Sequence, residues 1–249
     1  MAIDKPAGLL VHRSMLDKHE TQFAVQLLRD QIDQHVFPLH RLDRPTSGVL
    51  IFALSADIAR ACGEQFSQQQ IHKSYLAIVR GHTPESAVID YPLKEQLDKI
   101  ADKQARQDKA AQAALTEYQS LHHFELPFAV GRYPSARYSL VALKPKTGRK
   151  HQLRRHMKHI FHPIVGDTTH GDGKHNSFLQ QQFDLNGLAL SCVSMQMRHP
   201  VSQQNITFCC PPSGHISQLL VKWGLSEQQV QQLVPVPKNE SILKRGKTD

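Results

Sequence analysis

Six consecutive apolar residues at positions 49–54 form the longest apolar run of this chain, and they begin directly after a polar stretch at residues 40–48. A continuous apolar run of this length is typical of a strand that is buried on both faces. A membrane-spanning helix needs roughly 18 or more apolar residues in a row, and no window of the sequence approaches that length. The run therefore predicts an interior strand of a globular domain and excludes an integral membrane protein.

Strand and helix signals alternate along the rest of the chain. Residues 22–32 and 55–66 carry apolar side chains at helical spacing, and Ser55 is placed to cap the second of these helices. Residues 71–80 alternate between two faces, with Tyr75 on the same face as Lys73. Three further strands and one further helix are predicted at residues 137–143, 187–193 and 205–209, and at residues 149–160.

This mixture predicts a single α+β domain in which helices cover the faces of a mixed sheet. We expect the domain to occupy residues 1–225 and residues 226–249 to form a short helix followed by a flexible tail. A polar stretch at residues 95–112 is expected to be either an exposed helix or a mobile insertion.

The charge balance bears on possible partners. Lysine and arginine number 30 against 22 acidic residues, which gives a formal net charge of +8. This surplus favours a polyanionic partner, because clustered cations neutralise phosphates and release counterions, although an ordinary solvated basic surface has the same composition. The four cysteines contain no C-x-x-C pair, so we expect reduced thiols in a cytoplasmic protein. The first residues do not have the pattern of a signal peptide.

The polar stretch before the apolar run reads HRLDRPTSG from His40 to Gly48. Catalytic groups often lie on loops that a rigid element holds in place. Asp43 lies between Arg41 and Arg44, and nearby positive charge stabilises a carboxylate, so we expect Asp43 to stay ionised and to be available as a nucleophile or base. The same composition also suits an ordinary turn in which the aspartate caps backbone N–H groups.

A second stretch is strongly basic. Its lysine and arginine residues are Lys146, Arg149, Lys150, Arg154, Arg155 and Lys158. On a helix, His151, Arg154 and Arg155 would share a face, which suits phosphates or, for arginine, a carboxylate. The apolar Leu153 and Met157 indicate that one side is packed, which weakens the alternative of a fully solvated helix. The histidines of residues 151–162 have no acidic residue between them, so we expect no zinc site.

Taken in order, these stretches resemble the motifs of the RluA-type pseudouridine synthases. The matching segments are Asp4-Lys5-Pro6-Ala7-Gly8, the HRLDRPTSG stretch, Lys73-Ser74-Tyr75, Gly148-Arg149-Lys150-His151-Gln152-Leu153-Arg154 and His162-Pro163-Ile164-Val165-Gly166-Asp167. The chain further resembles a subgroup of this family that modifies uridine 65 of tRNA, at residues 97–103, 131–134, 154–156 and 166–171. In the last segment His170 replaces a tyrosine that is common in the wider family. Relatives usually carry another strand before the Lys5-Pro6 motif, so we expect one edge strand to be missing.

The resemblance implies the pseudouridine synthase fold, which is a mixed, mostly antiparallel sheet flanked by helices around a central catalytic cleft, without an S4 domain. It implies isomerisation of uridine in tRNA by a cytoplasmic enzyme that uses no cofactor and no metal. The partner is then folded tRNA, and we expect a monomer without an obligate protein partner or a membrane. The alternatives are the same chemistry on ribosomal RNA and a catalytically silent RNA-binding homologue.

The resemblance also implies roles for individual residues. Asp43 would be the essential carboxylate, Arg154 would pair with it, and Tyr75 would stack on the target base or help to move the C5 proton. The remaining residues are expected to contact the flipped nucleotide or the RNA backbone, and they are Arg41, Arg44, Arg149, His151 and Gln152.

Overall fold

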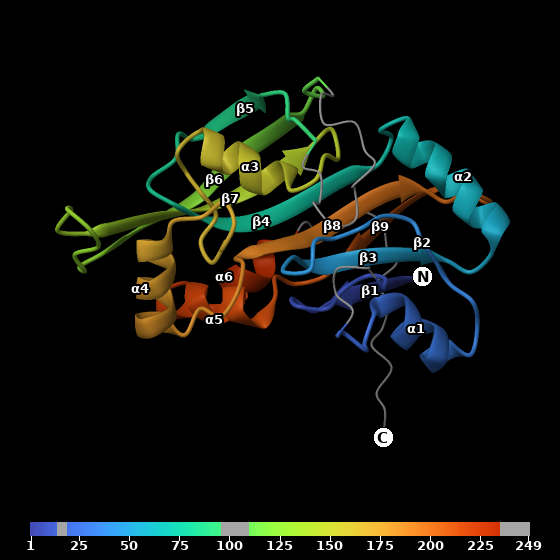
Figure 1. The fold of residues 1–249 in the computed structure, drawn as a ribbon, viewed down its shortest axis with the longest axis horizontal. Coiled ribbons are helices and arrows are strands. Elements are labelled where there is room, and N and C mark those ends of the chain that lie inside the picture. The colour runs from blue at the N-terminus through green and yellow to red at the C-terminus, as the bar shows by residue number, and fades with distance from the viewer. Residues whose placement is uncertain (14–18, 96–109, 235–249) are drawn as a thin grey trace.

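The computed structural model describes residues 1–13, 19–95 and 110–234 (Figure 1). Its body is a nine-stranded sheet with the order β1-β3-β8-β4-β7-β6-β5, to which β2 adds on β3 and β9 adds on β8. The strands are β1 (Ala2–Lys5), β2 (Phe37–Pro38), β3 (Ser47–Ala53), β4 (His72–Arg80), β5 (Ser86–Asp90), β6 (Leu115–Leu126), β7 (Ala136–Pro145), β8 (Leu190–Arg198) and β9 (Asn205–Cys209). Among these, β3 and β8 run parallel and the other paired strands run antiparallel, so the predicted mixed, mostly antiparallel sheet is confirmed.

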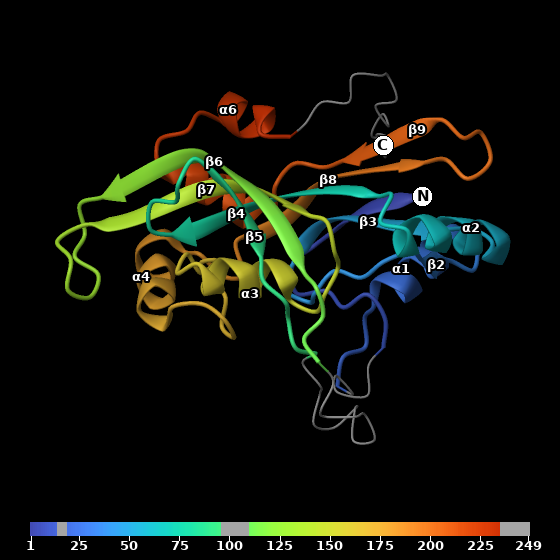
Figure 2. The same ribbon diagram turned by 90° about the horizontal axis from the view of Figure 1, so that it is seen from above.

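Helices lie on both faces of the sheet (Figure 2). They are α1 (Ala24–Ile32), α2 (Ala56–Ser67), α3 (Gln152–His159), α4 (Gly173–Phe183), α5 (Gly214–Lys222) and α6 (Glu227–Gln232). Helices α3 and α4 lie on the same side of the sheet, and α6 lies on the opposite side. Within the described residues, no helix combines the length and the hydrophobicity that crossing a membrane requires.

Alternate side chains of β4 pack into two different apolar clusters, on the two faces of this strand. On one side Tyr75, Ala77 and Val79 of β4 join the cluster that contains Leu153 and Met157 of α3. On the other side Ile78 joins the cluster that contains Ile216, Leu219 and Leu220 of α5. The alternation predicted for residues 71–80 is therefore confirmed, and it directs Tyr75 toward α3.

Most of the predicted elements are found close to their expected bounds. Residues 49–53 of the apolar run lie in β3, all seven residues of which are buried, whereas Leu54 lies beyond the strand and is 38% exposed. The predicted cap is confirmed, because the Ser55 hydroxyl accepts a hydrogen bond from the Ile58 N–H at 3.4 Å. The helix predicted at residues 149–160 begins only at Gln152, since His151 has a left-handed backbone with φ of 55°. A short helix after residue 226 is present as α6, while residues 96–109 and 235–249 lie outside the described residues.

Gly48 brings β3 unusually close to β8. Its φ is +110°, and a Cβ at this position would lie 2.2 Å from the carbonyl oxygen of Cys192. Only glycine tolerates both the backbone angle and the approach. Cys192 is aligned with Gly48 on one side and with Tyr75 on the other. The strand β8 therefore joins β3, which follows the loop of Asp43, to β4, which carries Tyr75.

Candidate active site

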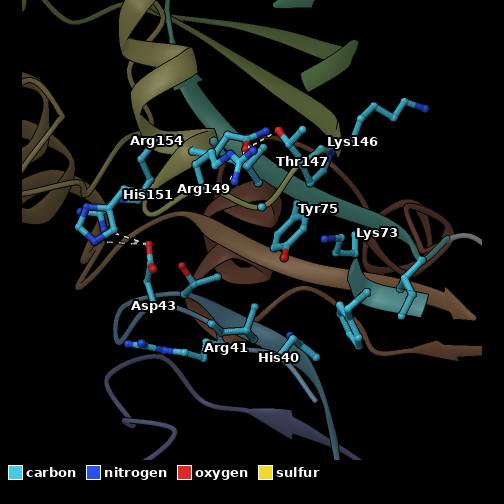
Figure 3. Close-up of a pocket in the computed structure, with 18 of the residues that line it drawn as sticks. His40, Arg41, Asp43, Lys73, Tyr75, Lys146, Thr147, Arg149, His151 and Arg154 are labelled. Atoms are coloured by element: carbon cyan, nitrogen blue, oxygen red, sulfur yellow. Dashed lines mark hydrogen bonds and ion pairs between the residues drawn. The ribbon is translucent and has the colours of Figure 1, made fainter. Parts of the chain in front are cut away.

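A cleft of about 590 Å³ opens where the loop before β3, the strand β4, the end of β7 and the first turn of α3 meet. Asp43, Tyr75 and Arg154 all line it. In Figure 3 the Asp43 carboxylate points toward His151 and Arg154, and the Tyr75 ring points into the same space. Four further cations line the cleft, and they are Arg41, Lys73, Lys146 and Arg149. The walls thus combine one carboxylate with a surplus of positive charge.

Arg154 connects Asp43 to a second carboxylate. Its Nη1 donates to Oδ2 of Asp43 at 3.2 Å, while Nε and Nη2 donate to the two oxygens of Asp167 at 2.7 and 2.8 Å. The Arg154 side chain is 5% exposed and that of Asp167 is 1% exposed, whereas Asp43 is 29% exposed. The bidentate contact with Asp167 therefore fixes the guanidinium, and the remaining N–H group is directed at the carboxylate that faces the cleft.

Asp167 is held in its charged form by its hydrogen bonds. Burial by itself would raise its pKa, but the hydrogen bonds from Arg154 and from the backbone N–H groups of His170 and Thr169 outweigh this effect and lower the pKa. Asp167 also lies just before a turn that places His170 next to α3. One buried carboxylate thus orients both the arginine and this turn.

Two neutral histidines lie beside Asp43. His151 Nδ1 and His170 Nε2 are 3.1 Å apart, so one ring donates and the other accepts. Burial lowers the pKa of His170 to about 4 and also lowers the pKa of His151. The other ring nitrogen of His151 lies 3.9 Å from Oδ2 of Asp43. The pair therefore adds a polar but uncharged wall at neutral pH next to the carboxylate.

The opposite wall carries Tyr75 and Lys73 from β4. Tyr75 is buried, and burial followed by its contact with Cys192 raises the pKa of its phenol well above the usual value. The phenol therefore stays protonated at every physiological pH. Burial lowers the pKa of Lys73, whose ammonium group lies 5.9 Å from the centre of the Phe66 ring. An aromatic ring, a hydroxyl and a partly desolvated cation thus face the space above Asp43.

The residues predicted to bind substrate fall into two groups. Arg41, Arg149 and His151 line the cleft with exposed or half-buried side chains. Gln152 also borders it but is 4% exposed, and its amide is bonded internally to Thr147, Thr116, the Leu115 carbonyl and the Arg149 N–H. Arg44 lies outside the lining, where it bonds the Gly8 carbonyl and pairs with Glu20. These two side chains hold the neighbouring loops in place in the structure.

Sequence reasoning assigned no role to three residues that build the site. Asp167 anchors Arg154, as described above. Lys5 is fully buried, and its ammonium group donates to the carbonyls of Pro6, Leu9 and Arg44, which ties the first loop to the loop of Asp43. His40 accepts a hydrogen bond from the Ile51 N–H at 3.1 Å, and burial lowers its pKa to about 4. All three residues lie in motifs of the resemblance, but their contacts were not visible in the sequence.

The described residues contain no group of three or more histidine, cysteine, aspartate or glutamate side chains arranged to hold a metal ion. The four cysteines are not disulfide-bonded. The cleft is therefore described by its own side chains alone.

A carboxylate that an arginine orients inside a basic cleft, on a mixed sheet covered by helices, defines an enzyme site for an anionic substrate. A family model described as RNA pseudouridylate synthase matches residues 1–159, and the chain belongs to this family. Similar proteins include one from Vibrio cholerae serotype O1, which is 60% identical over 204 residues (82% of this chain and 84% of the relative), and one from Haemophilus influenzae, which is 55% identical over 224 residues (90% and 94%). Both relatives are named tRNA pseudouridine synthase C.

Two solved structures share the fold. Human RNA Pseudouridylate Synthase Domain Containing 4 has a TM-score of 0.63 at 26% identity, with 89% of this chain and 88% of that chain covered. Human RNA Pseudouridylate Synthase Domain Containing 1 has a TM-score of 0.66 at 24% identity, with 96% and 92% covered. These similarities confirm the predicted fold class.

Proposed function

We propose that this protein isomerises uridine to pseudouridine in tRNA and that its target is uridine 65. The observation that carries the proposal is the contact of Asp43 with Arg154 inside a basic cleft, in a chain that covers 84% of a relative named for this reaction. The sequence resemblance to the subgroup that modifies uridine 65 supports the choice of target. The catalytic unit is proposed to be a single domain of residues 1–225 that acts as a cytoplasmic monomer.

The reaction detaches the uracil base at its C1′–N1 bond, turns it, and rejoins it to C1′ through C5. Asp43 is assigned the essential carboxylate, which attacks the sugar, attacks the base, or removes a sugar proton. Each of these routes needs a carboxylate held close to the reacting carbon. In the described structure both Arg154 and His151 face Oδ2 of Asp43. This arrangement leaves Oδ1 as the oxygen that meets the substrate.

The target nucleotide must leave its helix to reach Asp43, as it must for other enzymes that act on a base. Tyr75 is assigned to the space beside the flipped base, where its ring stacks or its hydroxyl relays the C5 proton. Arg41 is assigned to the gap that the base leaves or to the flipped phosphate, and Arg149 and His151 to the RNA backbone. The lining cations supply the field that attracts the phosphates.

The test uses tRNA labelled with tritium at uridine C5, because rejoining through C5 releases this label. We expect release from tRNA and none from ribosomal RNA. Release from ribosomal RNA alone would show that ribosomal RNA is the substrate. No release from either RNA would show that the protein binds RNA without modifying it. Mapping pseudouridine in tRNA from cells with and without the protein then locates the target.

Asp43→Asn separates catalysis from binding. We expect this variant to bind tRNA as the wild type does and to release no tritium, because the amide is nearly isosteric but is neither a nucleophile nor a base. Measurable turnover by the variant would refute the role of Asp43. Binding of both proteins should weaken steeply as salt rises, since phosphate contacts dominate.

A further inference from the structure

The residue after α3 has an unusual conformation for its type. Phe161 follows the helix with a left-handed backbone angle, φ of 65°, although this position usually carries glycine because a Cβ is strained there. Its side chain is 80% exposed, the highest value among the large apolar side chains of the described residues. A large ring thus lies in solvent at a position whose left-handed backbone angle glycine adopts with less strain.

Hydrogen bonds fix the backbone on both sides of this ring. The Phe161 N–H donates to the Lys158 carbonyl at 3.0 Å, and the Phe161 carbonyl accepts from Nη2 of Arg80 at 3.3 Å. The next residue, His162, donates its N–H to the Met157 carbonyl at 2.9 Å. Within the described residues the Phe161 ring stacks on no other aromatic ring, whereas nearby Tyr91 and His159 stack on each other. The backbone that carries the Phe161 ring is therefore fixed, while the ring itself lies in solvent.

The helix that leads to Phe161 is basic on its outer face. Residues 144–171 contain seven lysine or arginine residues and a single acidic residue, Asp167. That carboxylate is buried against Arg154 and contributes nothing to the surface. The nearest acidic side chain on α4, Asp172, is paired with Arg80. Arg155 is half-buried and Lys158 is exposed, and α3 supplies no carboxylate to either of them.

The helix α3 begins at the candidate active site, where Arg149 and His151 just before it line the cleft. Arg154 belongs to the same helix, and a rise of about 1.5 Å per residue places Phe161 roughly 10 Å further along its axis. Figure 2 shows α3 beside α4 on one side of the sheet, and Lys158, His159 and Phe161 at its C-terminal end are exposed. A nucleic acid whose target nucleotide enters the cleft would continue along this face.

We propose that the outer face of α3 is a second RNA contact, in which Arg155 and Lys158 hold backbone phosphates and the Phe161 ring stacks on an unpaired base of the same tRNA. The inference rests on the proposed function because it takes the RNA of the cleft as its ligand. Stacking of a base on an aromatic ring is tolerant of sequence, and lysine and arginine recognise phosphate without reading bases. The surface therefore recognises the shape of the RNA beyond the target uridine.

Phe161→Gly tests this surface, because glycine removes the ring and relieves the backbone strain together. We expect the Tm of this variant to equal or exceed that of the wild type, while its Kd for tRNA rises at least about fivefold. Phe161→Trp should restore binding. The matched control is Gln203→Gly, since Gln203 is exposed with φ of 58° in the turn between β8 and β9. Equal Kd values for Phe161→Gly and the control would overturn the proposal.

Lys158→Gln tests the phosphate contact. We expect it to lower the slope of log K against log salt by about one, whereas Phe161→Gly weakens binding and leaves that slope unchanged. Lys222→Gln on α5 is the control cation. All binding is measured with the Asp43→Asn variant, so that the result does not depend on turnover. Failure of the wild type to release tritium would then count against the proposed function, and unchanged binding by Phe161→Gly and Lys158→Gln would count against this surface.

Discussion

Replacing Asp167 by asparagine removes the charge that holds Arg154 while it keeps the size of the side chain. Asparagine still offers an oxygen to the N–H groups of Thr169 and His170, which donate to Oδ1 of Asp167 at 2.9 Å each. It offers no second acceptor to Arg154, which now donates to both carboxylate oxygens. The variant therefore isolates the ion pair from the turn that Asp167 also supports.

The expected cost follows from burial. The two side chains are 5% and 1% exposed, and breaking a buried pair by removing one partner costs about 3–5 kcal/mol, since an unpaired charge remains. Asp43 still lies 3.2 Å from Arg154 and compensates part of the charge, so we expect the lower end, about 3 kcal/mol. For a chain of this size that loss corresponds to a fall in Tm of roughly 6–12 °C. Tritium release should also fall, because Arg154 no longer has a fixed orientation toward Asp43.

Asp172→Asn is the matched control. Asp172 also pairs with an arginine and also accepts from backbone N–H groups, at the start of α4, where asparagine caps equally well. Its pair is 26–35% exposed, so we expect a loss of only about 0–1 kcal/mol. Thermal unfolding followed by circular dichroism compares the two variants. A Tm for Asp167→Asn no lower than that of Asp172→Asn would refute the argument that Asp167 holds Arg154 by charge.

Three further predictions concern Tyr75 in the cleft wall and two residues behind the cleft, His170 and Lys5. Tyr75→Phe keeps the buried ring but removes its hydroxyl. If the hydroxyl relays the C5 proton, kcat falls about a hundredfold or more while KM stays nearly unchanged. An unchanged kcat would show that Tyr75 acts on the base only by stacking. Burial lowers the pKa of His170 from its usual 6.5 to about 4. As pH falls from about 6.5 to about 4, His170 is therefore protonated in the unfolded chain but not in the folded one, which lowers the free energy of unfolding. His170→Gln should therefore lose less unfolding free energy than the wild type over that range in urea titrations, and equal losses would contradict the assignment. Lys5→Met leaves three carbonyls without their donor, so we expect a loss of about 1–3 kcal/mol and faster proteolysis around residues 6–9 and 44; unchanged proteolysis would show that Lys5 does not tie these loops together.

The sequence predicted those elements whose pattern is local. The strand β3 was visible because residues 49–53 form a continuous apolar run, and β4 because its residues alternate. Helices α4 and α5 and the strands β5 and β6 were not predicted. Their polar outer residues obscure the pattern, and in α4 only Leu179 is buried. The start of α3 was placed three residues early, because nothing in the local sequence shows that His151 turns its backbone to a left-handed angle.

The site was predictable to the extent that its residues carry recognisable motifs. Asp43, Tyr75 and Arg154 were grouped from the resemblance, and the structure brings all three to one cleft. The bidentate clamp of Asp167 on Arg154 joins residues 13 positions apart across a turn, and no spacing rule predicts it. Nor does spacing predict the contacts of Gln152 and Arg44, which the resemblance assigned to RNA and which bond to neighbouring loops in the structure.

We expect the position of β8 in the sheet to set when the chain becomes functional during its synthesis. Residues 190–198 lie between β3 and β4, so β3 with its partners β1 and β2 is not joined to β4 with its partner β7 until Arg198 has been synthesised. A nascent chain that already contains Asp43, Tyr75, Arg154 and Asp167 still lacks the strand that aligns with both Gly48 and Tyr75. We therefore expect an unfinished chain to be inert toward RNA, and a fragment that ends at residue 159 to fail to form the cleft although it contains nearly every motif.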